Sequence, residues 1–561
     1  MGKQLKQAIR EIKNVSFSSF LSNLSDDKET DYSLWKATKF LKRPKNHIPP
    51  IRKEDGGWAR ESAQKAELFA QYLASTFQPH LRQTADEYIP PISNRDETRV
   101  RPVTPEEVGS EIDKNVNSKK APGYDLITGR IMKELPRRGI VKLTHLINAA
   151  FRLHYVPMQW KVAEVIMIPK PGKPPNDKTS YRPISLLPMI SKIFEKLLLR
   201  RLRPIIEERN LVPNHQFGFR NKHSTIDQVH RITNILEKAL EEKRICSTIF
   251  LDVAQAFDKV WHRGLEYKLE RDLPKHFSKL LKSYISGRYF RVKQEDSYSE
   301  LRKITAGVPQ GSVLGPVLYL LYTNDIPTCE EAVIATFADD TAIIAEGDTI
   351  EEATEKLQTA TDKVNSWTKR WRIKLNEGKS VHVNFTNRKT KYLPVVINRQ
   401  AIPHENSAKY LGMTLDSKLR WKVHVKKKRI ELEHKFRKMY WLLGRRSELS
   451  VHNKLLLYKQ VLKPVWTYGV QLWGCTKKSN RRIIQMFQNK VLRCIVNAPW
   501  FIRNDDIHKD LNIATIEEEV QRFARKHELR LHNHQNTEML QILDNAGLVR
   551  RLDRTKPFEL V

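Results

Sequence analysis

Short apolar runs and longer amphipathic segments alternate along most of the chain. Apolar runs bounded by polar residues, typical of buried strands, occupy residues 163–169, 247–251, 332–337 and 341–344. Apolar residues recur at helical spacing in 61–73, 104–115, 186–206 and 225–242. The second helical segment begins with a Thr-Pro pair typical of a helix N-terminus. Strands and helices mixed in this order predict an α+β fold built around a sheet.

The pattern changes at about residue 415. Four basic and mostly helical segments follow, at 419–430, 453–463, 481–497 and 516–534, and a short polar tail ends the sequence. Residues 1–60, at the other end, are polar and basic and predict a linker or arm. With 561 residues, the chain exceeds what one hydrophobic core usually organises, so we expect about three or four structural units.

Two clusters of carboxylates stand at the ends of strand-like runs. Asp252 directly follows one run, while Asp339 and Asp340 lie between two others, where a tight turn would place both acids at the tip of a hairpin. Paired acids of this kind suit two-metal phosphoryl transfer. Carboxylates without histidine suit Mg²⁺, with Mn²⁺ as a substitute, better than zinc. Alternatively, either motif alone is an ordinary solvated turn, in which Asp is common.

A glycine-bracketed loop, 306–316, lies between the acid clusters and precedes a helical segment. Such a loop lets backbone N–H groups approach a nucleotide, and Gln310 within it can hydrogen-bond a sugar or a base edge. The alternative is a routine connection between a strand and a helix. Asp258, close after the first acid, is assigned a structural role, because the run 256–261 resembles the capped start of a helix.

The charge of the chain points to a polyanionic partner. Lys and Arg number 99 against 64 Asp and Glu, a net charge of +35 spread along the sequence, which predicts salt-sensitive binding to nucleic acid. Basic surfaces also occur on membrane-surface proteins, but no apolar run approaches the roughly 18 residues of a membrane span. The N-terminus lacks the apolar core of a secretory signal. We therefore expect an intracellular protein without a membrane partner.

Six motifs in a fixed order carry a resemblance to a known family. They are Tyr181-Arg182-Pro183-Ile184-Ser185-Leu186-Leu187, Gln216-Phe217-Gly218-Phe219-Arg220, Leu251-Asp252 with Ala256-Phe257-Asp258, Gly307-Val308-Pro309-Gln310-Gly311-Ser312, Phe337-Ala338-Asp339-Asp340 and Tyr410-Leu411-Gly412-Met413. This set resembles the reverse transcriptase of non-LTR (LINE-type) retrotransposons, and its nearest match is the jockey-like group. The resemblance covers residues 30–535.

The resemblance implies a right-hand polymerase with fingers, a palm containing an antiparallel sheet, and a helical thumb. Its expected parts are a linker or N-terminal arm at 1–100, fingers at 101–240, a palm interleaved with the fingers at 241–400, primer grip and thumb at 401–535, and a tail at 536–561. Family members usually carry an endonuclease before the fingers, for which this sequence leaves no room. We therefore expect an N-terminally truncated chain.

The resemblance also assigns the metal site and the reacting groups. It places Asp252, Asp339 and Asp340 as the palm acids, with the backbone of Val253 completing the metal shell. It makes Lys379, in preference to a second nearby lysine, the acid that protonates the pyrophosphate leaving group.

The substrate contacts follow in the same way. Phe257 stands at the position where an aromatic ring excludes the ribose 2′-hydroxyl, although an ordinary core role is the alternative. Gln310 and Gly311 lie beside the incoming sugar. Lys170 and Arg182 meet the triphosphate, as Arg binds phosphate bidentately. The primer grip is formed by Tyr410, Leu411 and Gly412.

The implied function is RNA-directed DNA synthesis. The enzyme would extend a DNA primer with dNTPs on an RNA template by two-metal nucleotidyl transfer, for retrotransposition, and would act in the nucleus. Two alternatives stay open: a catalytically inactive nucleic-acid-binding remnant, and a maturase-like or telomerase-like reverse transcriptase.

Overall fold

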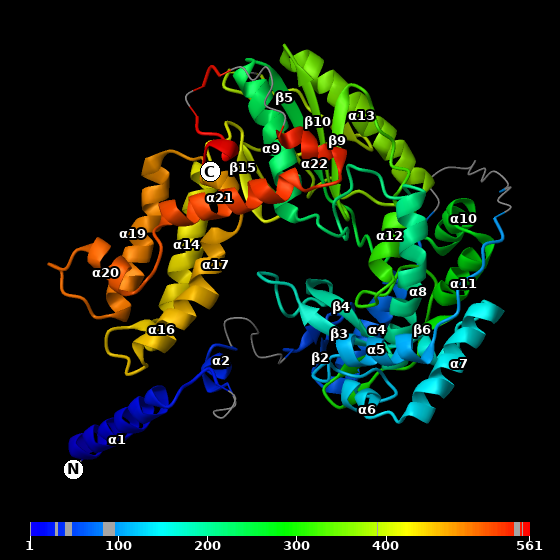
Figure 1. Cartoon of the computed structure of the whole chain (residues 1–561), viewed down its shortest axis with the longest axis horizontal. Coiled ribbons are helices and arrows are strands. Elements are labelled where there is room, and N and C mark those ends of the chain that lie inside the picture. Colours follow the sequence, from blue (N-terminus) through cyan, green and yellow to red (C-terminus); the bar gives the residue numbers. More distant parts are fainter. Residues whose placement is uncertain are drawn as a thin grey trace.

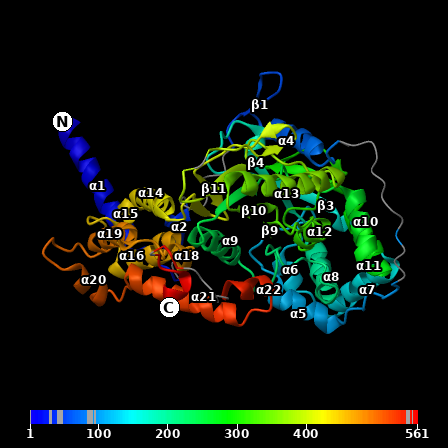
Figure 2. The same ribbon diagram turned by 90° about the horizontal axis from the view of Figure 1, so that it is seen from above.

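The computed structural model describes residues 2–27, 32–39, 48–81, 92, 96–389, 391–543, 550–552 and 554–560. In Figure 1, a four-stranded sheet lies at the top, a five-stranded sheet with its helices lies below it on the right, and the C-terminal helices lie on the left. Helix α1 (Gly2–Ser22) extends away from the body beside the C-terminal helices, as Figures 1 and 2 show.

A four-stranded antiparallel sheet forms the centre of the fold. Its strand order is β11 (Val381–Phe385), β5 (Ile245–Leu251), β10 (Asp340–Gly347) and β9 (Ala332–Phe337). Successive side chains of β5 point to opposite faces: Ile249 packs in the core with α13 (Ile350–Arg370), and Phe250 packs in the core with α9 (Thr225–Glu241). Because helices cover both faces, every residue of β5 is buried.

The second sheet lies against α4 (Ser62–Thr76), whose Phe69 packs beside Val165 and Phe290. Its strands are β4 (Tyr181–Leu186), β3 (Val162–Pro169), β6 (Arg288–Gln294) and β7 (Ser297–Tyr298), with β8 (Arg302–Ile304) also paired to β6. Three two-stranded sheets are β1 (Ile51–Arg52) with β2 (Trp58–Ala59), β12 (Val396–Ile397) with β13 (Gln400–Ala401), and β14 (Ser407–Tyr410) with β15 (Met413–Asp416).

A helical layer shares one apolar core below the central sheet. It contains α5 (Pro105–Asn115), α6 (Gly129–Lys133), α7 (Arg137–Leu153), α8 (Met189–Glu208), α10 (His262–Asp272), α11 (Lys275–Ile285) and α12 (Gly315–Tyr322). Helix α5 begins with a capping box, in which Thr104 Oγ1 accepts from Glu107 N at 3.2 Å and Thr104 N donates to Glu107 Oε2 at 3.0 Å.

The C-terminal helices share a core with the α9 face of the sheet. They include α14 (Lys422–Lys438), α15 (Tyr440–Leu443), α16 (Val451–Leu457), α17 (Lys463–Thr467), α18 (Val470–Trp473), α19 (Lys478–Ile495), α20 (Asn504–Asp510), α21 (Ile516–His532) and α22 (Thr537–Leu540). Helix α21 returns to α9, where Arg530 forms an ion pair with the buried Asp227. The end of α1 and the segment after it join the same core through Leu21 and Leu24.

The expected strands and most of the expected helices are confirmed, with small shifts at their ends. The predicted helix at 186–206 begins only at Met189, because Leu186 ends β4 and Pro188 stands at the N-cap. The helix start expected at 256–261 is wrong: these residues form turns, and α10 begins at His262. Within the described residues, no helix is both long and apolar enough to span a bilayer.

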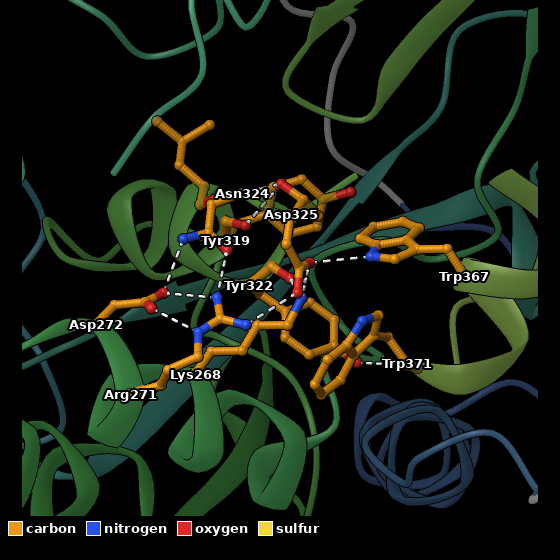
Figure 3. Close-up of polar contacts among 11 residues, drawn as sticks. Lys268, Arg271, Asp272, Tyr319, Tyr322, Asn324, Asp325, Trp367 and Trp371 are labelled. Atoms are coloured by element: carbon orange, nitrogen blue, oxygen red, sulfur yellow. Dashed lines mark hydrogen bonds and ion pairs between the residues drawn. The ribbon is translucent and has the colours of Figure 1, made fainter. Parts of the chain in front are cut away.

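A buried ammonium group joins three helices of this fold (Figure 3). Lys268 on α10 is inaccessible to solvent, and its Nζ donates to the Tyr322 carbonyl oxygen and to Asp325 Oδ1, each at 2.5 Å. The same Nζ lies 3.9 Å from the ring centroid of Trp371, just after α13. Trp367 Nε1 donates to Asp325 Oδ1 at 2.9 Å. One charge thus holds α10, the end of α12 and α13 together.

We predict that Lys268→Met lowers the free energy of unfolding by about 3 kcal/mol, because it leaves the Asp325 carboxylate without its buried partner. Urea denaturation followed by tryptophan fluorescence measures this loss. The control is Lys282→Met, which removes a half-exposed cation paired with Glu266 and should cost less than about 1 kcal/mol. Equal costs for the two variants would contradict the prediction.

Candidate active site

The tip of the β9–β10 hairpin carries two acids. The two strands pair up to Asp340, which leaves Ala338 and Asp339 as a two-residue turn with Ala338 at a φ of 57°. On its other side, β10 pairs with β5 up to Leu251, the residue before Asp252. The sheet register therefore brings the three acids to the same end of two neighbouring strands.

Burial and mutual repulsion raise the pKa values of the two hairpin acids. For Asp340, burial and then the charges of Asp339 and Asp252 raise the pKa to about 6. For Asp339, burial is again the largest cause and the charge of Asp252 adds to it. Carboxylates crowded in this way favour a cation between them.

The donor atoms at this site fit a hard divalent cation. Within the described residues, no group of three or more His, Cys, Asp or Glu side chains is arranged to hold a metal ion. Carboxylate oxygens of Asp252, Asp339 and Asp340 are nevertheless the ligand type that Mg²⁺ prefers. Val253 lines the same cavity as Asp252 and Asp339, and no hydrogen bond to its carbonyl oxygen occurs in the described part of the chain, so this oxygen is a candidate for a fourth ligand.

One cavity of about 1140 Å³ is lined by both acids and cations. Asp252 and Asp339 are among its acidic lining residues, and Lys170, Arg182 and Lys379 are among its cationic ones. Lys170 Nζ donates to the Thr179 carbonyl at 2.8 Å, and Lys379 Nζ lies 3.9 Å from Asp252 Oδ2. Burial, and then the charges of Arg182 and Lys379, lower the pKa of Lys170. The cavity therefore offers cationic side chains to an anion, beside carboxylates of the type that divalent cations prefer.

The ring of Phe257 forms part of the cavity wall and is held from behind. It stacks on Tyr319 of α12, with centroids 4.5 Å apart and planes 21° apart. Phe219 meets its edge at 5.9 Å. Aromatic contact on two sides fixes the orientation of the ring.

The loop before α12 joins the turns after β5 to strand β4 of the second sheet. Gln310 Nε2 donates to Asp258 Oδ1 at 2.8 Å, and the Gln310 carbonyl accepts from Ser185 N of β4 at 2.8 Å. Gly311 has a φ of 111°, and a Cβ there would lie 2.8 Å from the Ser185 carbonyl oxygen, so only glycine fits. Burial raises the pKa of Asp258 to about 7.

The expected primer-grip residues form the β14–β15 hairpin. Leu411 and Gly412 make its two-residue turn, with φ values of 44° and 82°. Tyr468 Oη donates to the Leu411 carbonyl at 2.6 Å and packs under the glycine. Tyr410 is buried, with its ring 5.3 Å from Phe250, so the turn alone reaches the surface.

Sequence reasoning missed the residues that support these side chains. Tyr319 behind the Phe257 ring and Gln216 beside the acid hairpin received no such role, and Asp258 was expected to be structural as part of a helix start, not as the partner of Gln310. Gln216 belongs to a motif that the sequence offered, and Gly218 two residues later was a signal of close backbone approach.

Comparison with known proteins identifies this part of the chain. Residues 168–415, which hold the acids and most of the cavity residues, match the protein family described as "Reverse transcriptase (RNA-dependent DNA polymerase)". The chain contains a reverse transcriptase domain. Its acid-bearing hairpin in an antiparallel sheet confirms the expected α+β right-hand fold, while the subdomain boundaries at 100, 240, 400 and 535 stay predictions.

Three curated relatives come from Drosophila melanogaster. The probable RNA-directed DNA polymerase from transposon X-element is 40% identical and aligns with 97% of this chain and 61% of its own length. The probable RNA-directed DNA polymerase from transposon BS is 37% identical and aligns with 98% of this chain and 62% of its own length. The RNA-directed DNA polymerase from mobile element jockey is 38% identical and aligns with 99% of this chain and 63% of its own length. The chain thus spans about three-fifths of the length of these relatives.

Among solved structures, telomerase from Candida albicans with an RNA fragment aligns with 70% of this chain and 67% of its own at 12% identity, with a TM-score of 0.35. At this TM-score the similarity supports no conclusion about the chain.

The buried carboxyl of Asp258 predicts a pH-dependent stability. Because its pKa rises from 3.8 to about 7 on folding, the folded state keeps a proton that the unfolded state has released. Stability from this group is therefore lost as pH rises from about 4 to 7. Asp258→Asn removes the linkage, so the variant should gain in free energy of unfolding relative to wild type between pH 5 and pH 8.

Urea denaturation at both pH values measures this gain. Asp296→Asn, at an exposed turn, is the control. A difference between Asp258→Asn and wild type that is the same at pH 5 and pH 8 would count against a buried, protonated Asp258.

Proposed function

We propose that the chain is an RNA-directed DNA polymerase that extends the 3′ end of a DNA primer with dNTPs on an RNA template. The observation that carries this proposal is the cavity whose lining includes Asp252 and Asp339 together with Lys170, Arg182 and Lys379. A nucleoside triphosphate with its metal ions is the ligand that matches both charges. The curated relatives named as RNA-directed DNA polymerases support the same conclusion.

The metal site consists of Asp252, Asp339, Asp340 and the Val253 carbonyl. Bound Mg²⁺, or Mn²⁺ in its place, would activate the primer 3′-oxygen and neutralise charge on the triphosphate. Lys379 stands beside Asp252, where its ammonium can protonate the leaving pyrophosphate.

The fingers hold the incoming nucleotide. Lys170 and Arg182 bind the triphosphate, and Arg182 does so bidentately. Gln310 and Gly311 lie beside the sugar, and the braced ring of Phe257 blocks a ribose 2′-hydroxyl.

The template and primer run from this cavity toward the C-terminal helices. The turn Leu411–Gly412 would hold the primer end. The basic helix α14 would then follow the duplex through phosphate and 2′-hydroxyl contacts. The relatives belong to mobile elements, so we assign the activity to retrotransposition, with the nucleus as its site of action.

The expected result of Asp339→Ala is loss of dNTP incorporation to background, because the variant removes a metal ligand. Primer extension on poly(rA) with an oligo(dT) primer and Mg²⁺ measures this loss. Asp296→Ala, which removes an exposed carboxylate outside the cavity, should retain wild-type activity. A wild-type chain that incorporates no dNTP would sink the proposal and favour an inactive nucleic-acid-binding remnant.

The proposed role of Phe257 as a steric gate against the ribose 2′-hydroxyl leads to a separate prediction. Phe257→Val should reduce the preference for deoxynucleotides over ribonucleotides by roughly tenfold or more, because the smaller side chain leaves space for the 2′-hydroxyl. Single-turnover incorporation of dTTP and of the matching ribonucleotide measures this preference. Phe501→Val, at an exposed ring outside the cavity, is the matched control. Unchanged discrimination in the Phe257 variant would show that the ring is only a core residue.

A further inference from the structure

The amide of Gln216 binds the turn that carries Asp339. Its Oε1 accepts from Ala338 N at 2.8 Å and from Gly218 N at 2.8 Å, and its Nε2 donates to the Ala338 carbonyl at 3.2 Å. The side chain is only 4% exposed, so water does not compete for these bonds. One buried amide therefore satisfies both backbone groups of Ala338.

Ala338 needs such support because of its conformation. Its φ of 57° lies in the left-handed region, which costs a residue with a Cβ on the order of 1 kcal/mol or more. The carbonyl that Gln216 holds belongs to the peptide group shared with Asp339. Fixing that peptide plane fixes the backbone from which the Asp339 carboxylate projects.

The segment bearing Gln216 is itself attached to the outer edge of β9. Phe217 N donates to the Thr336 carbonyl at 2.9 Å, and Thr336 N donates to the His215 carbonyl at 3.1 Å. A Cβ on Gly218 would lie 2.2 Å from Ala338 N, so the backbone there presses directly against the turn. The segment thus forms a parallel β-bridge with β9, between Gln216 and Thr336, directly beside the turn that carries the acids.

A second buried amide provides a natural comparison. Gln228 Nε2 donates to the carbonyls of Thr336 at 2.9 Å and His215 at 3.0 Å. It ties the same two segments together as Gln216 does, but none of its bonds reaches Ala338 or Asp339.

We propose that Gln216 is a positioning residue for the metal site: it holds the Ala338–Asp339 turn in the conformation that presents Asp339 to the metal ions. This inference rests on the proposed polymerase function. Losing the amide lets the turn relax, so metal binding weakens while the β-bridge and the sheet stay in place.

The test compares Gln216→Met with Gln228→Met in the full chain, since Met has nearly the shape of Gln without its hydrogen bonds. Two readouts are measured: the Mg²⁺ concentration for half-maximal primer extension, and binding of Mn²⁺ by electron paramagnetic resonance. We expect Gln216→Met to weaken both by about tenfold or more, the usual cost of removing support from a metal ligand. Gln228→Met should shift both by less than about twofold.

Gln216→Glu is the milder second variant, for use if Gln216→Met fails to fold. Its carboxylate keeps the two acceptor contacts but cannot donate to the Ala338 carbonyl, and we expect the same direction of change. Equal shifts for the variants at 216 and 228, or none at 216, would overturn the inference while leaving the polymerase intact.

Failure of the proposed function gives a different result. In that case the wild-type chain incorporates no dNTP at any Mg²⁺ concentration. If the wild-type chain nevertheless binds Mn²⁺ and Asp339→Ala does not, Mn²⁺ binding by the Gln216 and Gln228 variants still tests the positioning role of Gln216. Wild-type protein that binds no Mn²⁺ would overturn both proposals.

Discussion

The arrangement of the molecule depends on holding three like charges together at one end of a sheet. Asp252, Asp339 and Asp340 repel one another, and this repulsion adds to partial burial in raising the pKa values of the two hairpin acids. Only a rigid frame keeps such a cluster in place. The frame is the sheet formed by β5, β10 and β9, which α9 and α13 cover on its two faces. None of these three strands can shift its register by one residue without turning apolar side chains away from the core.

The sequence allowed the elements of this frame to be predicted where local pattern and tertiary environment agree. The capping box at Thr104 and the apolar run of β5 are signals of this kind. The pattern failed at 256–261, where tertiary bonds replace helical ones. Val308 N donates to the Phe257 carbonyl and Gly307 N to the Val260 carbonyl, each at 2.8 Å, so the gate segment is held by a distant loop in place of its own helix. Helix α1 was missed because the polar, basic character of residues 1–60 was interpreted as an arm.

In the candidate site too, some residues could be predicted from the sequence and others could not. Motif order indicated which acids and cations to consider, because those residues carry the chemistry themselves. The supporting contacts join residues far apart in the chain, as Gln216 to Ala338 and Asp258 to Gln310, and no local pattern reports them. Tyr410 illustrates the reverse: the motif is present, but the ring belongs to the core and only the following turn is exposed.

The gate and the buried ammonium are connected through one short helix. Tyr319 of α12 stacks on Phe257, and Tyr322, one turn further on, donates to the Trp371 carbonyl and accepts from Lys268 at its own carbonyl (Figure 3). Helix α12 therefore contacts the Phe257 ring through its middle, at Tyr319, and its C-terminal end is held by the ammonium of Lys268, which is inaccessible to solvent. Since packed side chains resist small displacements, the position of the gate ring depends on this internal network as well as on its own neighbours. The sugar selection proposed for Phe257 would in this way depend on the core that joins α10 and α13.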